Sequence, residues 1–252
     1  MVTVLHQQQN NACEQLFKHM NLSDCPTCAD VLVFSGKHGL GMSTCVQHIA
    51  YVLGRKCVVL SNQAAELSFF PSQWLAEHFG LFTIKCSSTQ LPRSLVAMAK
   101  LVELKVIVIE DFQDFKSIPP RHISTIIDDL TALRRAVPGL CIILTVADNS
   151  LSWLKYAISD LALVSAVVTM RPLLRGADFS SFINGYVYAK RTGYLDVFSV
   201  PKVLELLYKL FELSIGRFVL AIDMVLRAAV ELPYEALLIR VEVIVNALQV
   251  QR

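Results

Sequence analysis

The stretch VLVFSGKHGLGMSTCVQHIAYVLGRKCVVLS, residues 31–61, decides the fold that this chain can adopt. A short apolar run typical of a buried strand is followed by a glycine-rich turn, a helical pattern and a second apolar run. Gly36, Gly41 and Ser43 have the spacing of G-x-x-x-x-G-K-[ST], the loop whose backbone N–H groups wrap phosphates at a helix N-terminus. Met42 stands in the lysine position and can neither donate a hydrogen bond nor carry a charge. The stretch predicts a P-loop, but Met42 weakens the inference of ATP hydrolysis.

The candidate nucleotide site takes in the whole turn and the start of the following helix. Lys37 is the one cation inside the turn, and it could bend inward to replace the missing charge. The residues expected to contact nucleotide are Gly36, Lys37, His38, Gly39, Leu40, Gly41, Met42, Ser43 and Thr44.

Composition narrows the class of protein. Of 252 residues, 54% are hydrophobic and 17% charged, yet no uninterrupted apolar run approaches the ~20 residues of a membrane-spanning helix. Residues 1–11 are polar and glutamine-rich and show no signal-peptide pattern, so we expect a cytoplasmic protein with no membrane contact. The net charge of +2 is low for a stand-alone nucleic-acid-binding domain. It suits an oligomer in which each subunit supplies only one or two phosphate contacts.

The seven cysteines, an odd number, indicate reduced thiols. Cys13, His19, Cys25 and Cys28 offer a Cys3His set with which the chain could hold zinc. The alternative is a loop before the first strand whose cysteines are incidental, and a single C-x-x-C pair does not decide between the two.

Strand and helix patterns alternate as far as residue 170, which predicts an α/β fold with a doubly wound parallel sheet. The predicted strands cover residues 31–35, 56–61, 105–110, 140–146 and 162–170, with a short extended segment at 81–86. The predicted helices between them cover residues 12–20, 43–53, 71–79, 89–104, 119–137 and 151–160. Only helices follow, at 178–191, 201–213, 216–231 and 233–249. We expect an N-terminal helix and loop (1–30), a P-loop NTPase core (31–175) and a C-terminal all-helical lid (176–252).

Two acids follow the apolar strand at 105–110. P-loop NTPases hold Mg²⁺ with the loop hydroxyl and an acid at such a strand end, so Ser43 and Glu110 are the expected metal ligands. Asp111 would then be the catalytic base, with Glu110 assisting. The usual order is Asp followed by Glu, and the inversion shortens the base by one methylene. The alternative is an acidic pair that meets a basic neighbour at the sheet edge.

Two further positions are candidates for sensing the γ-phosphate. Thr145 ends the strand at 140–146, and Asp148 or Asn149 could substitute for it; ordinary loop polarity explains all three equally well. Arg217 follows Gly216 at the start of a tail helix and could reach the phosphates, or it could be a solvated arginine after a capping glycine.

From residue 12 onward the chain resembles the TniB/TnsC/MuB group of AAA+ transposition regulators. The resemblance rests on SGKHGLGMST (35–44), VIVIEDFQDF (106–115) and CIILTVADNS (141–150). It extends to RPLLRGADFSSFINGYVYA (171–189) and LYKLFELSIGRFVLAIDMVLRAAVELPYEAL (207–237), which look like the lid of that family. It makes Gly36 to Ser43 the Walker A motif, Glu110 and Asp111 Walker B, Thr145 sensor 1 and Arg217 sensor 2.

The resemblance implies a protein that binds ATP or ADP with Mg²⁺, forms homo-oligomers or hetero-oligomers on double-stranded DNA, and links a target-selecting protein to the transposase. Lys85, Arg93, Lys100 and Lys105 are the candidate DNA contacts, although each alone could be an ordinary solvated residue. The chain departs from the family at Met42, at the inverted acids and near residues 164–165, where the family arginine is missing. We therefore expect slow or absent turnover. An active ATPase with a displaced lysine, or a scaffold unrelated to transposition, are the alternatives.

Overall fold

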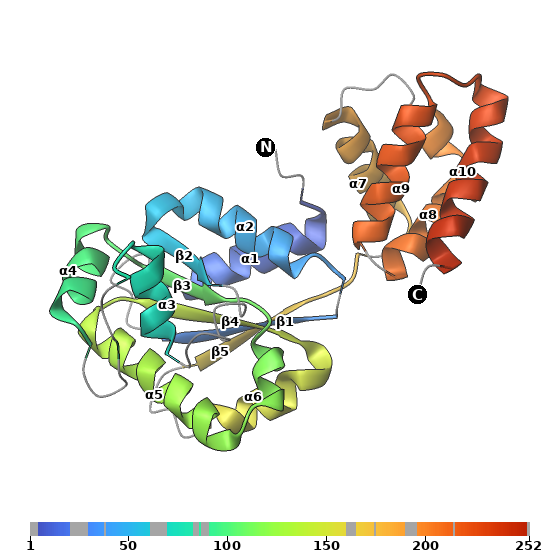
Figure 1. Cartoon of the computed structure of the whole chain (residues 1–252). Coiled ribbons are helices and arrows are strands. Elements are labelled where there is room, and N and C mark those ends of the chain that lie inside the picture. The colour runs from blue at the N-terminus through green and yellow to red at the C-terminus, as the bar shows by residue number, and fades with distance from the viewer. Residues whose placement is uncertain are drawn as a thin grey trace. The chain divides into compact units, whose positions relative to one another are not determined.

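The computed structural model describes residues 5–20, 30–37, 39–60, 70–82, 86, 91–159, 165–173, 175–189, 196–213 and 215–250. The chain divides into two compact units. The sheet unit comprises Ala12–Gly36 and Met42–Met170, and the helical unit comprises Met1–Asn11, Lys37–Gly41 and Arg171–Arg252. The tip of the glycine-rich loop thus groups with the C-terminal helices, although the loop belongs to the sheet's first crossover. Figure 1 labels the elements of both units.

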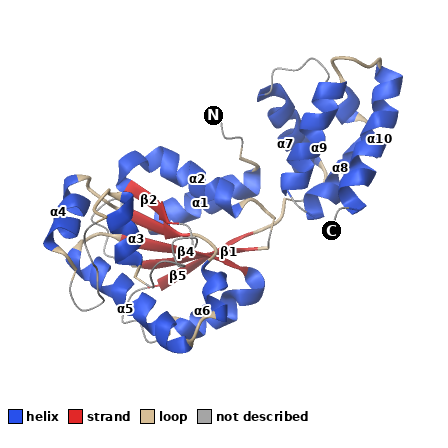
Figure 2. Cartoon of the chain, in the orientation of Figure 1, coloured by secondary structure: helices blue, strands red, loops and turns tan. Residues whose placement is uncertain are grey.

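The sheet unit is built on five parallel strands in the order β2-β3-β4-β1-β5 (Figure 2). Strand β1 pairs on one side with β4 and on the other with β5, so that Phe34 lies beside both Thr145 and Val168. Strands β1 and β3 are buried along their whole length, which explains their continuous apolar sequences. The strands are β1 (Val31–Gly36), β2 (Cys57–Leu60), β3 (Val106–Ile109), β4 (Cys141–Ala147) and β5 (Ser165–Met170).

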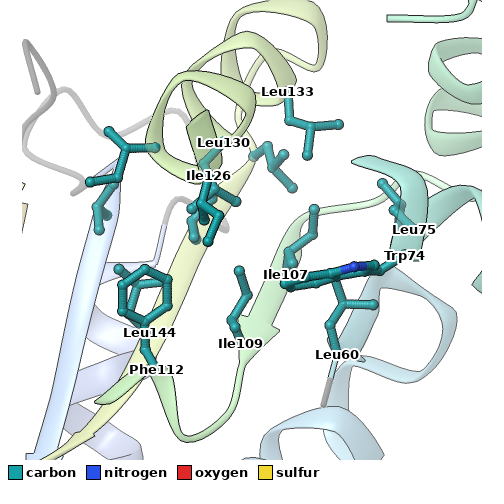
Figure 3. Packing of buried hydrophobic residues seen from close by; sticks show 14 of the residues in the cluster. Leu60, Trp74, Leu75, Ile107, Ile109, Phe112, Ile126, Leu130, Leu133 and Leu144 are labelled. Carbon is teal, nitrogen blue, oxygen red and sulfur yellow. The ribbon is translucent and has the colours of Figure 1, made fainter. Parts of the chain in front are cut away.

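Helices cover both faces of this sheet. On one face, a single hydrophobic cluster joins β1–β4 to α3 (Pro71–His78), α4 (Arg93–Leu101), α5 (Pro120–Ala136) and α6 (Leu151–Ala157). In Figure 3, Trp74, Ile107, Ile126 and Leu144 are among the residues of this cluster. The other face lies against α1 (Gln7–His19) and α2 (Met42–Leu53), which run side by side in Figure 1. The core is therefore a three-layer α/β/α sandwich.

The C-terminal helices have a separate hydrophobic core. Four phenylalanines, Phe179, Phe182, Phe211 and Phe218, pack together in it with ring centroids 5.4–6.2 Å apart. Aromatic rings at such separations add to the stabilisation from apolar burial. The helices are α7 (Ala177–Ala189), α8 (Pro201–Leu213), α9 (Ile215–Ala228) and α10 (Tyr234–Val250).

The five strands appear where the sequence predicts them, and most helices agree to within a few residues. The helix predicted to start at residue 12 begins at Gln7, because His6 and Gln9 cap it. The helix predicted at 89–104 spans only Arg93–Leu101, since it follows Pro92 and ends before Glu103, whose φ is 52°. Leu81, Phe82 and Cys86 belong to no strand, and residues 83–85 of that predicted segment lie outside the described residues.

Within the ranges listed above, no helix is both long and apolar enough to cross a bilayer.

A buried carboxylate joins two helices of the sheet unit. Asp129 on α5 is fully buried and accepts hydrogen bonds from the backbone N–H of Ser72 (2.7 Å) and from its hydroxyl (2.8 Å). The backbone bond satisfies a donor in the first turn of α3, which no side chain at the N-cap position does. Asp129 therefore fixes α3, which carries Trp74, against α5.

Replacing Asp129 with alanine should lower the free energy of unfolding by about 3 kcal/mol, because two bonds to a charged group are lost and the buried Ser72 N–H is left without a partner. Chemical denaturation followed by tryptophan fluorescence measures the change. Asp128→Ala is the matched control, since Asp128 is the exposed neighbour on the same helix and should change stability by less than ~0.5 kcal/mol. Equal losses in both variants would contradict the capping role.

Candidate nucleotide-binding site

The glycines of the loop after β1 are required by the backbone that the structure adopts. Gly39 and Gly41 both have φ of 85°, a conformation that other residues rarely adopt. Gly36 ends β1 at a point where an added Cβ would lie 3.0 Å from the Met42 sulfur. The helix α2 begins at Met42 directly after the loop, as in a P-loop. His38, also predicted to contact nucleotide, lies outside the described residues.

The side chain of Met42 lies back over Gly36. The position of a Cβ at Gly36 is 3.0 Å from the Met42 sulfur, 3.3 Å from its Cγ and 3.4 Å from the Cβ of Met170 at the end of β5. An apolar thioether therefore packs where a P-loop lysine would start toward the β- and γ-phosphates. Lys37, the predicted substitute, is exposed in the loop.

The outward-facing carbonyls of the loop are hydrogen-bonded to other segments of the helical unit. The Gly39 carbonyl accepts a bond from the backbone N–H of Ile215, the first residue of α9, at 2.8 Å. The side-chain amide of Gln9 on α1 donates to the carbonyls of Leu40 and Gly41, both at 3.3 Å. Because N–H and C=O point in opposite directions across a trans peptide, the N–H groups of Gly41 and Met42 face away from Gln9. This is the arrangement that an anion-binding loop needs.

Gln9 is held by a reciprocal cap at the start of α1. The His6 backbone N–H donates to Oε1 of Gln9 at 3.1 Å, and the Gln9 N–H donates to Nδ1 of His6 at 3.2 Å. This is the geometry of a capping box in which histidine takes the place of serine or threonine. The His6 ring meets Phe182 and Phe211 edge-on, with centroids 5.4 and 5.7 Å away. Sequence reasoning missed both residues, because histidine is not a usual N-cap residue and the segment reads as an unstructured polar run.

Ser43 and Glu110 come together as the sequence predicts for a magnesium site. Burial raises the pKa of the half-buried Glu110, a hydrogen bond from Ser43 opposes this shift, and the charge of Asp111 adds to it. A hydroxyl and a carboxylate in contact at the end of a strand are the protein ligands that Mg²⁺ takes together with substrate phosphates. These residues fit the ion, which when bound would neutralise phosphate charge.

Asp111 is positioned by two side chains. Its backbone adopts a left-handed conformation with φ of 52°, and its N–H donates to the hydroxyl of Thr145 at 2.9 Å. Gln113 donates to Oδ1 of Asp111 at 2.9 Å and accepts a bond from the Ala147 N–H at 3.2 Å. The proposed sensor hydroxyl is therefore buried and bonded to the Walker B backbone. Gln113, which the sequence analysis missed, links the Asp111 carboxylate to the end of β4.

Other predicted residues have other partners or fall outside the described ranges. Arg217 donates a hydrogen bond to the carbonyl of Leu248, near the C-terminal end of α10, at 3.3 Å. The dipole of a helix stabilises a positive charge at this end. The thiols of Cys13 and Cys45 hydrogen-bond to each other. Cys25 and Cys28 are not among the described residues. In the part of the chain that the structure describes, no group of three or more His, Cys, Asp or Glu side chains could hold a metal ion.

Three of the four predicted DNA contacts lie among the described residues. Arg93 and Lys100 are exposed and lie two turns apart on α4, on the same face of that helix. Lys105 precedes β3, whereas Glu110 follows it. Lys105 therefore lies at the amino ends of the parallel strands, and the Ser43–Glu110 pair lies at their carboxyl ends. Lys85 falls outside the described residues.

No family model matches the chain, and no curated protein matches its sequence. Among solved structures, the chain is similar to the Walker-type ATPase PABY2304 of Pyrococcus abyssi, with 13% identity and a TM-score of 0.49 over 76% of this chain and 60% of that one. It is similar to Pif1 in a study of unwinding at forked double-stranded DNA by two coordinating Pif1 helicases, with 12% identity and a TM-score of 0.36 over 78% of this chain and 50% of that one. It is also similar to Bacteroides sp. Pif1 in complex with ADP-AlF4, with 12% identity and a TM-score of 0.37 over 74% of this chain and 47% of that one. The chain covers less than two thirds of each of these structures.

The strand order, the glycine loop after β1 and the contact between Ser43 and Glu110 define a P-loop NTPase fold. The helices that follow the sheet give it an AAA+-like form. Because the sequence identities are this low, the similarity concerns the fold alone, and the activities of the three proteins are not assigned to this chain.

The histidine that caps α1 should make stability depend on pH. Burial lowers the pKa of His6 from 6.5 to about 4, so between these values the unfolded chain binds more protons than the folded one. The contribution of His6 is complete above pH 6.5 and is lost as the pH falls toward 4. The free energy of unfolding should therefore drop by about 2 kcal/mol between about pH 7.5 and pH 5 through this residue.

Urea unfolding of the wild type and of His6→Asn at the two pH values measures this effect. Asparagine is a good N-cap residue that does not titrate, so the variant should lose most of the His6-dependent difference while remaining folded. The same pH dependence in both proteins would show that His6 is not the group responsible.

Proposed function

We propose that this chain is an AAA+-like regulator of DNA transposition, which binds ATP or ADP with Mg²⁺, assembles on double-stranded DNA, and links a target-selecting protein to the transposase. The observation that carries the nucleotide-binding part is the P-loop backbone, with left-handed Gly39 and Gly41 and its carbonyls bonded on the outside. The transposition part is supported by the sequence resemblance to the TniB/TnsC/MuB group. An oligomer on DNA can convey target information without hydrolysis.

Weak or absent hydrolysis follows from the side chains around this loop. The P-loop lysine normally stabilises charge on the transferring phosphate, and Met42 has none to offer. Asp111, in the catalytic position, is one methylene shorter than the usual glutamate, which reduces its reach toward an attacking water, and Gln113 donates a hydrogen bond to its Oδ1. We infer that nucleotide acts on this protein chiefly as a ligand that biases assembly.

The second candidate is an active ATPase in which Lys37 supplies the missing charge, an alternative favoured by the exposure of Lys37 within the loop. Hydrolysis that disappears in both Lys37→Ala and Asp111→Asn would support this alternative.

Restoring the lysine tests whether Met42 is the cause of lost charge stabilisation. Met42→Lys should raise the affinity for Mg·ATP at least tenfold, or about 1.4 kcal/mol, because an ammonium group then meets the phosphates. Hydrolysis should stay slow, since the acids remain inverted. Isothermal titration calorimetry measures the affinity, with Met42→Leu as the matched apolar control. Equal affinities of the two variants would exclude this account of Met42.

The proposed function as a whole is tested by binding of a fluorescent ATP analogue with Mg²⁺, with and without duplex DNA, alongside light scattering. The expected result is nucleotide binding together with DNA-dependent assembly. Assembly on DNA without nucleotide binding would leave an adaptor that no longer uses nucleotide. If neither occurs, the transposition proposal is wrong, and a scaffold of another kind replaces it.

A further inference from the structure

The P-loop of this chain lacks its lysine, yet its backbone is tied at three consecutive carbonyls. One bond comes from the first N–H of α9 to Gly39, and two come from the Gln9 side chain to Leu40 and Gly41. Gln9 itself is buried, with 2% of its surface exposed, and the Leu40 side chain is buried at 4%. The bond from Gln9 to Leu40 is therefore buried and the one to Gly41 partly buried, which limits the access of water that would compete for these carbonyls.

We propose that Gln9 is a positioning residue for nucleotide phosphates. Its amide holds the two loop peptides that follow Leu40 and Gly41 with their carbonyls outward and their N–H groups available to the phosphates. The proposal rests on the nucleotide binding proposed above and adds the residue that orders its loop. With no lysine to attract the phosphates, affinity depends on a loop that is already in its binding shape, since ordering it on binding would cost free energy.

The same side chain connects the loop to the aromatic core of the helical unit. Gln9 is fixed through the reciprocal cap with His6, whose ring packs against Phe182 of α7 and Phe211 of α8. Together with the bond from Ile215, the loop has contacts to α1 and α9 directly and to α7 and α8 through His6. All these residues belong to the helical unit, so the loop and the C-terminal helices share one set of contacts.

The two ends of the Gln9 amide have separate roles, which allows them to be separated by substitution. Glutamate keeps the oxygen that caps the His6 N–H, as glutamate does in an ordinary capping box, but it cannot donate to the loop carbonyls. Gln9→Glu thus leaves the cap of α1 and removes the positioning bonds. Gln9→Met removes both without adding charge. Gln7→Glu adds the same charge at an exposed site in the same helical turn and serves as the matched control.

The first measurement is the affinity of each full-length variant for Mg·ADP and for AMP by calorimetry. Gln9→Glu and Gln9→Met should weaken Mg·ADP binding about tenfold relative to Gln7→Glu, as expected for buried hydrogen bonds. AMP should be affected less, because it carries only one of the two phosphates that such a loop cradles. A purely structural role in α1 would lower the thermal stability of both Gln9 variants and change the affinities for Mg·ADP and AMP equally.

The second measurement is hydrogen–deuterium exchange of the peptide that covers residues 36–44, without nucleotide. Its amides should exchange at least threefold faster in Gln9→Glu than in Gln7→Glu, because the loop loses its two restraints. If the wild type binds Mg·ADP but the Gln9 variants match the control in affinity and exchange, the positioning role is overturned and nucleotide binding stands. If the wild type binds no nucleotide, the nucleotide-binding part of the proposed function fails and the role of Gln9 toward phosphates fails with it, while the exchange rates still show whether Gln9 orders the loop.

Discussion

The end of β1 imposes the constraint on which the rest of this structure depends. The strand lies between β4 and β5 and stops at Gly36, where the space for a side chain is taken by Met42 and Met170. The chain must then turn within five residues into α2, and Gly39 and Gly41 make that turn in a conformation that other residues avoid. The point at which α2 begins and the path of the loop backbone follow from this turn.

The backbone and the side chains of the P-loop depart from each other in this chain. Backbone features of a P-loop persist, because glycines and hydrogen-bonded carbonyls depend on conformation rather than on charge. The side chains differ from those that accelerate phosphoryl transfer, since Met42 packs over Gly36 in the lysine position and the order of the two acids, Glu110 and Asp111, is inverted. Losing a lysine leaves the core unaffected, whereas losing a glycine from the turn would strain its backbone. This asymmetry explains how such a loop can retain its shape after its catalytic groups have altered.

Part of the candidate site could be predicted from the sequence, and part could not. The Ser43–Glu110 contact was predictable, because the carboxyl ends of parallel strands meet the loop after β1 at one edge of the sheet. Thr145 lies in β4, two residues before the end of the strand, and its hydroxyl accepts a hydrogen bond from the Asp111 N–H. Gln9, Gln113 and the capping role of His6 escaped prediction, because each acts across a long distance in sequence or in place of a more usual residue type.

The sequence by itself determined the α/β core, the order of its elements and the position of the loop, because these depend on hydrophobic periodicity and on glycine spacing, which are local. The tertiary structure decided which groups hold the loop: the Gln9 amide, the first N–H of α9 and, behind them, the His6 ring among phenylalanines. It also decided that Arg217 bonds to the end of α10. A hydrogen bond depends on distance and direction between two atoms, and for residues more than thirty positions apart only folding brings those atoms together.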